Sequence, residues 1–110
     1  MDAVELFWRP GCLHCRLLRR YLRRHHVPLD ERNIWTDPQA AAVVRSVTGG
    51  QETVPTVRIG GRAMVNPPGR KVLAVLATDA PHLLPDGYGP PRPGRLVRFV
   101  LRVLRVLGRS

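Results

Sequence analysis

The first 34 residues constrain the fold most, because two short apolar runs stand on either side of a helical pattern. Residues 3–8 (A-V-E-L-F-W) are rich in strand formers, and the following R-P-G provides a turn. Residues 27–34 offer a second strand. A strand, a crossover helix and a second strand normally form a right-handed parallel unit. The chain is therefore expected to begin an α/β sheet.

The segment between these strands, residues 12–25, has the periodicity of an amphipathic helix. Its apolar positions recur every three or four residues, and arginines fill much of the rest. These positions are Leu17, Leu18, Tyr21, Leu22 and His25. The pattern predicts a helix with a basic outer face.

Two further helices are indicated by a capping residue followed by proline. Asp37 and Pro38 form such a start for residues 39–47, and two glycines then end that helix. Asn66 and the proline after it repeat the pattern before a helix at residues 71–77. Each helix follows a predicted strand, as expected for an α/β domain.

Gly60 and Gly61 separate two strand patterns, at residues 53–59 and 62–65. A two-residue glycine turn between such patterns predicts an antiparallel hairpin. The expected order is β-α-β-α-β-β-α. It gives a four-stranded mixed sheet with three helices.

Cys12 and Cys15, the only cysteines, lie at the start of the first predicted helix. Their spacing places both sulfurs within one turn, so a disulfide can form and break without moving the backbone. The helix N-terminus favours a thiolate at Cys12, whereas Cys15 lies deeper in the helix. Cys12 is therefore the expected nucleophile and Cys15 the resolving thiol. A protonated His14, with Arg9 and Arg16, would stabilise the Cys12 thiolate further.

Metal binding and nucleic-acid binding are weaker interpretations of the same features. A zinc site needs four ligands, and the chain has no second C-x-x-C. His14 is too near the cysteines to complete a tetrahedron easily, and His25 and His26 lie roughly 15 Å further along the helix. The net charge of +10 is suited to nucleic acid, but aromatic residues make up only 5% and no binding signature is present. No metal and no specific nucleic acid are expected, and inert thiols are a minor alternative.

The chain contains three separate motifs: P-G-C-x-x-C after a strand, T-V-P-T, and a G-G hairpin. Together they resemble the glutaredoxin branch of the thioredoxin fold. The run A-A-A-V-V-R-S-V-T-G-G-Q-E-T-V-P-T, followed by V-N-P, is similar to mycoredoxins, glutaredoxin relatives that work with mycothiol. The resemblance implies a cis peptide before Pro55 and a thiol-binding role for Thr53, Val54 and Pro55. It also implies a substrate-binding role for Arg9, which takes the place of a basic residue common in glutaredoxins. His14, which lies between the two cysteines, is a further candidate substrate-binding residue.

The resemblance implies a thiol-disulfide oxidoreductase that reduces mixed disulfides of proteins with a low-molecular-weight thiol, without a bound cofactor. The Leu13-His14 dipeptide departs from the family, and the Gly-x-x-Asp-Asp segment that holds glutathione is missing. The missing segment favours mycothiol over glutathione as co-substrate, although the basic first helix favours anionic glutathione. Two alternatives remain open: a dithiol redoxin recycled by a flavoprotein reductase, and a non-catalytic adaptor recruited to a membrane.

The expected organisation is a glutaredoxin-like domain at residues 1–78, a Pro/Gly-rich linker at 79–94 and a basic amphipathic helical tail at 95–109. Five arginines of the tail share an arc of about 80°, and the rest of its surface is Leu, Val and Phe. Such a helix is expected to lie on a membrane surface, a partner or the domain itself. The N-terminus does not resemble a secretion signal, so a cytoplasmic location is expected.

Overall fold

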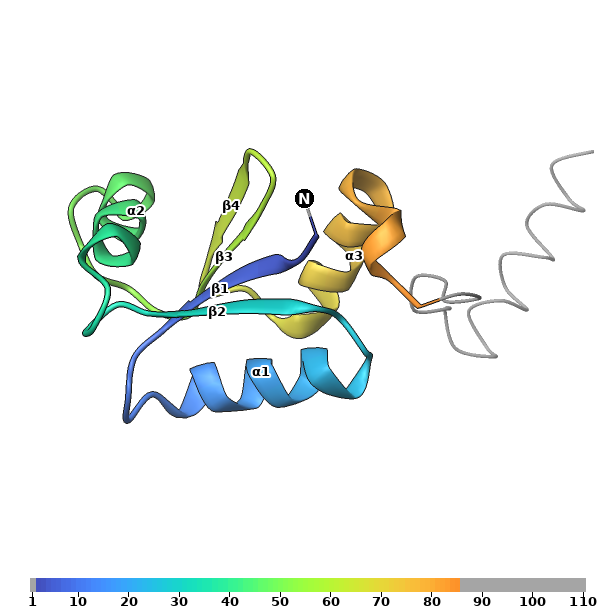
Figure 1. Ribbon diagram of the computed structural model, residues 1–110, viewed down its shortest axis with the longest axis horizontal. Coiled ribbons are helices and arrows are strands. Elements are labelled where there is room, and N and C mark those ends of the chain that lie inside the picture. Colours follow the sequence, from blue (N-terminus) through green and yellow to red (C-terminus); the bar gives the residue numbers. More distant parts are fainter. Residues whose placement is uncertain (1, 86–110) are drawn as a thin grey trace, which may run out of the picture.

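In the computed structural model, which describes residues 2–85, parallel pairing of the first two strands organises the sheet (Figure 1). The strands are β1 (Val4–Trp8), β2 (Leu29–Asn33), β3 (Thr56–Ile59) and β4 (Arg62–Val65). β1 pairs parallel with β2 and antiparallel with β3, and β4 completes the order β2-β1-β3-β4. The predicted four-stranded mixed sheet and its glycine hairpin are confirmed.

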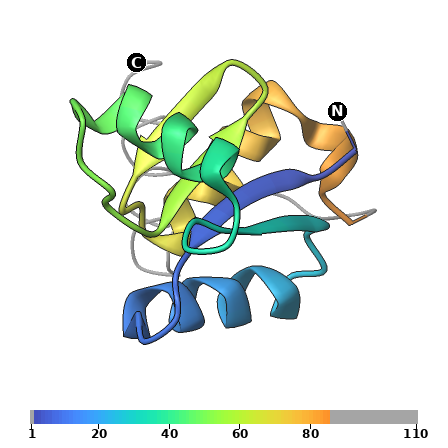
Figure 2. The ribbon, with the colours of Figure 1, turned by 60° about the vertical axis from the view of Figure 1, so that its left-hand side comes forward.

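The helices cover both faces of this sheet, which buries two separate apolar clusters (Figure 2). The helices are α1 (Leu13–Arg24), α2 (Pro38–Thr48) and α3 (Gly69–Asp79). Because side chains alternate along a strand, Val4 and Leu6 of β1 pack with α1 and α3, whereas Phe7 packs with α2. All three of these side chains are fully buried. The C-terminal end of β1, which leads into the cysteine-containing turn, is thus fixed from both sides.

The start of α3 differs from the prediction. Asn66 does not cap the helix: its backbone is left-handed, at φ 54°, and its N–H donates to the Pro55 carbonyl at 2.7 Å. The helix begins at Gly69, and the preceding residue, Pro68, makes no side-chain cap. Pro67 is itself followed by a proline, which disfavours helical backbone at Pro67, so the helix does not begin directly after Asn66. Asparagine tolerates the left-handed region.

The packed domain continues beyond residue 78, where the sequence analysis placed its end. Ala80 and Leu83 belong to the larger apolar cluster, and Pro81–Leu83 forms a 3₁₀ turn. Pro81 suits the first position of a helical turn because its φ is already fixed there. The expected helix at 95–109 and most of the expected linker lie outside the described residues. Within residues 2–85, no helix is long and apolar enough to cross a membrane.

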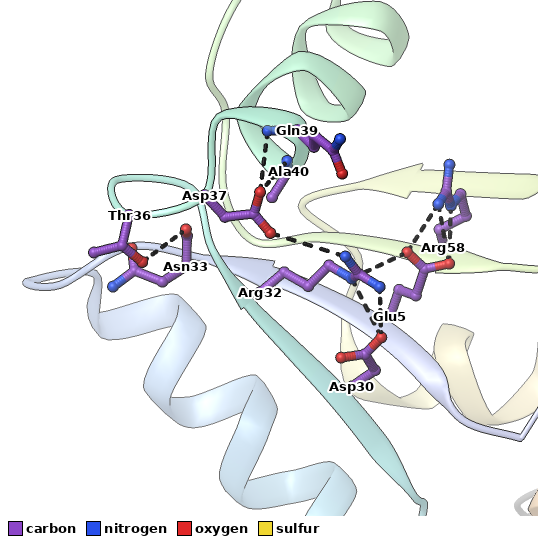
Figure 3. A network of polar contacts seen from close by, with 9 residues as sticks. All are labelled: Glu5, Asp30, Arg32, Asn33, Thr36, Asp37, Gln39, Ala40 and Arg58. Carbon is purple, nitrogen blue, oxygen red and sulfur yellow. Dashed lines mark hydrogen bonds and ion pairs between the residues drawn. The ribbon is translucent and has the colours of Figure 1, made fainter.

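Charged residues occupy the α2-side face of the sheet where the strands are not covered by that helix (Figure 3). Glu5 of β1 lies opposite Arg58 of β3 and accepts from its guanidinium at 2.8–3.2 Å. Arg32 of β2 contacts Asp30 at 3.0 Å, Glu5 at 3.6 Å and Asp37 at 3.8 Å. Asp37 also caps α2 by accepting two backbone N–H groups. The network therefore joins three strands to the first turn of α2.

Candidate active site

Cys12 is the N-cap residue of α1, at the end of the turn that follows β1. Gly11 makes this turn possible with a left-handed backbone at φ 78°. The Cys12 sulfur accepts the backbone N–H of Cys15 at 3.2 Å, in the position that a serine or aspartate oxygen takes in other helices. A thiolate there is stabilised by this N–H and by the positive end of the helix dipole.

The loop before β3 brings a second segment to the same sulfur. The Val54-Pro55 peptide is cis, as the resemblance implied. The Cys12 sulfur lies 3.9 Å from the Val54 carbonyl oxygen, 42 residues away in sequence. Thr56 steadies the loop by donating its hydroxyl to the Thr53 carbonyl at 2.8 Å. The structure therefore brings Val54 to the Cys12 sulfur, with Thr53 and Pro55 beside it in the chain.

Cys15 lies one turn further along α1, in a different environment. Its residue is only 1% exposed, whereas Cys12 is partly exposed. Burial raises the pKa of Cys15 to about 12, a hydrogen bond with the Cys12 side chain acts in the same direction, and the Arg9 backbone opposes them. Cys15 is therefore a protonated thiol at neutral pH, and only Cys12 is open to a substrate.

Arg9 and His14, the other predicted site residues, have exposed side chains. Within residues 2–85 neither side chain makes a hydrogen bond or an ion pair with a cysteine, although the Arg9 backbone is hydrogen-bonded to Cys15. Their substrate-binding roles therefore stay predictions. No group of three His, Cys, Asp or Glu side chains in this range is arranged to hold a metal ion.

Two features near the site were missed by the sequence analysis. Arg19 of α1 places its guanidinium 4.9 Å from the ring centre of Trp8, the last residue of β1. Leu17, assigned above to the apolar face of the helix, is in fact 54% exposed, and Leu13 is 65% exposed. On a helical wheel Leu17 lies about 130° from the centre of the positions that the structure buries, so its exposure depends on which side of α1 meets the sheet.

Comparisons with known proteins agree with this geometry. The sequence profile of the family described as Glutaredoxin matches residues 4–64. Rv3198A of Mycobacterium tuberculosis, a protein named as a glutaredoxin, is 35% identical over 75 residues, which are 67% of this chain and 89% of that protein.

Solved structures of two glutaredoxins show the same fold. The glutaredoxin grx-1 of Archaeoglobus fulgidus matches with a TM-score of 0.59 at 21% identity, over 69% of this chain and 87% of that one. The Brucella melitensis glutaredoxin matches with a TM-score of 0.52 at 25% identity, over 81% of this chain and 95% of that one. The profile and the relative, together with the Cys12 and Cys15 pair, show that this chain belongs to the glutaredoxin family and is a thiol-disulfide oxidoreductase.

Proposed function

We propose that this protein reduces mixed disulfides between protein cysteines and a low-molecular-weight thiol, with Cys12 as nucleophile. The observation that carries the proposal is the contrast between its two thiols. The Cys12 sulfur is partly exposed and accepts an N–H at the start of α1. Cys15 is buried and its raised pKa keeps it protonated. The Cys12 sulfur can therefore attack a substrate, whereas the Cys15 thiol is buried and remains protonated.

The proposed cycle has two exchange steps. The Cys12 thiolate attacks the small thiol's sulfur in the mixed disulfide, and the protein's sulfur leaves as a thiolate that takes a proton from water. Cys12 is then joined to the small thiol. A second small thiolate attacks the small thiol's sulfur in that disulfide, which releases the symmetrical small-thiol disulfide and restores Cys12. One small thiol is consumed for each protein cysteine reduced.

Cys15 serves only the second, dithiol route in this proposal. After Cys12 attacks a disulfide within a protein, Cys15 must lose its proton and attack the Cys12 sulfur, which closes a Cys12–Cys15 disulfide and frees the protein dithiol. The raised pKa of Cys15 slows this attack at neutral pH. The mixed disulfide on Cys12 therefore persists long enough to meet a second small thiol.

Mycothiol is the proposed small thiol, with glutathione as the less favoured one. The Gly-x-x-Asp-Asp segment that the resemblance assigns to glutathione binding is missing after β4, the first turn of α3 contains no acidic residue, and it carries Arg70 and Lys71. Two cations there disfavour the ammonium group of the glutamyl end of glutathione. Thr53, Val54 and Pro55 are proposed to bind the cysteinyl part through their backbone. A cytoplasmic site of action and a membrane or partner contact through residues 95–109 stand as proposals from the sequence.

The proposal predicts different effects for the two cysteine variants. Cys12→Ser should abolish turnover of a mixed-disulfide substrate, because no other described thiol is accessible. Cys15→Ser should keep a substantial part of it. Thiol-dependent reduction, followed side by side with mycothiol and glutathione, measures both effects. Activity that survives Cys12→Ser but not Cys15→Ser contradicts the assignment, and turnover only with a flavoprotein reductase favours the dithiol alternative.

A further inference from the structure

The side of α1 that points away from the sheet carries exposed apolar residues directly beside the nucleophile. Leu13 is 65% exposed and Leu17 is 54% exposed, and the two lie one turn apart. In Figures 1 and 2 no other described element covers this side of α1. We call Leu13, Leu17, Arg20, Arg24 and the partly buried Tyr21, whose ring also packs against Gly69 of α3, the outer face. Large adjacent apolar side chains in water commonly mark an interaction site.

The charges on this side of α1 are not neutralised. Arg19 and Arg23, on the flank toward β2, share Glu31 at 3.4 and 2.7 Å. Arg20 and Arg24 of the outer face make no ion pair with any residue in the range 2–85. The helix itself contains no acidic residue. A partner for this face therefore has to supply negative charge as well as apolar surface.

The outer face also has a shape that a side chain can enter. Leu17, Arg20, Tyr21 and Arg24 line a shallow groove of about 320 Å³. Its apolar contacts come from the leucine and the tyrosine ring, and the two guanidinium groups stand beside them. A leucine or phenylalanine flanked by carboxylates complements this combination.

The charge of the outer face and its position beside Cys12 indicate which kind of partner binds there. The chain's own segment 95–109 contains five arginines and no acidic residue, so like charges oppose its binding here. The outer face begins at Leu13, next to Cys12, so a protein whose disulfide reaches Cys12 must pass close to it. A bilayer resting on Leu13 would crowd that approach.

We propose that the outer face of α1 is a docking surface for protein substrates in which an acidic amphipathic segment flanks the modified cysteine. This inference rests on the proposed function, because it assigns a substrate class to the same nucleophile. The apolar groove binds an apolar side chain of the segment, and Arg20 and Arg24 bind its carboxylates.

Two peptides test this selectivity with the full chain. They share apolar residues and one cysteine held in a mixed disulfide with the small thiol, but one carries glutamates where the other carries lysines. The acidic peptide should be reduced with a kcat/KM about tenfold higher than the basic one. The double variant Arg20→Gln, Arg24→Gln should lose most of this preference, while its turnover of a small uncharged disulfide is unchanged.

A matched control removes two arginines elsewhere. The variant Arg45→Gln, Arg62→Gln breaks two exposed ion pairs on α2 and β4 and should retain the preference. Leu17→Ala should weaken the use of both peptides equally, because they share the same apolar residues.

Separate readouts distinguish failure of docking from failure of the proposed function. Turnover of the small disulfide without any peptide preference overturns only the docking surface. Where turnover is absent, fluorescence anisotropy with cysteine-free acidic and basic peptides still decides, and equal binding overturns the inference. It is also overturned if Arg20→Gln, Arg24→Gln abolishes binding to phosphatidylglycerol vesicles while peptide use is unchanged, because the face would then bind lipid.

Discussion

Two cysteines at the start of one helix show how position alone gives the same side chain two different environments. Cys12 takes the N-cap position, where its sulfur replaces a capping oxygen and remains partly exposed. Cys15, three residues later, points to the sheet and is 1% exposed. The first environment stabilises a thiolate, and the second penalises one. The position of each cysteine in the first turn of α1 therefore determines whether its thiolate form is favoured.

Alkaline pH should destabilise the domain through Cys15. Its pKa is raised from 9.0 in the unfolded chain to about 12 in the folded protein. Between these values the folded state holds the proton more tightly, so the free energy of unfolding falls as pH rises. Below pH 9 the full contribution is present. Urea unfolding from pH 8 to 11 should show a steeper loss for the native chain than for Cys15→Ala, and equal slopes would contradict the assignment.

At the scale of elements, α1 and α3 approach each other so closely that only glycine fits at one contact. A Cβ built on Gly69 would lie 2.2 Å from Cδ1 of Tyr21 and 2.8 Å from its Cγ. The Gly69 backbone is not in the left-handed region, so the restriction is steric. This contact fixes the start of α3 against α1, and with it the position of the loop that follows β4.

Gly69→Ala should therefore destabilise the protein by about 1–3 kcal/mol, because the tyrosine ring or the helix must move. The same substitution in a Tyr21→Ala background should cost clearly less, since the clashing ring is gone. Urea denaturation of the four proteins measures the coupling. An equal cost in both backgrounds would show that the Tyr21 ring is not its cause, because helix propensity by itself favours alanine over glycine.

At the scale of the whole molecule, the sheet is held together on its charged face by pairs that cross three strands. The Glu5 side chain is 24% exposed and accepts hydrogen bonds from two nitrogens of Arg58. Arg32 forms an ion pair with the same carboxylate from the neighbouring strand β2. Through Asp37 the network also contacts the first turn of α2 (Figure 3). Strand pairing and helix placement are thus coupled by one set of charges.

A double-mutant cycle at Glu5 and Arg58 should give a coupling free energy of about 1 kcal/mol, larger than for an isolated surface pair of the same type. The two-nitrogen geometry and the partial burial are the reasons. Glu5→Ala, Arg58→Ala and the double variant are compared by urea denaturation at low and high salt. A coupling near zero at both salt concentrations would mean that apolar packing alone holds these strands.

Local patterns in the sequence were sufficient for most of the fold and for the cysteine pair. Alternation of side chains, capping residues and the Gly60-Gly61 turn each act within a few residues, so they predicted the order of strands and helices. The same approach failed at Asn66, where the second of the two following prolines disfavours helical backbone at the first, and after residue 78, where proline-rich composition concealed core residues.

The sequence by itself determined the α/β order, the cysteine pair at a helix start and the basic character of α1, because these depend on neighbours along the chain. Only the tertiary structure decided that the Val54 carbonyl faces the Cys12 sulfur, that Cys15 is buried, and that Leu13 and Leu17 point outward. These facts depend on segments up to 42 residues apart meeting in space. Burial and long-range contact are properties of the packed sheet and helices, and no local pattern contains them.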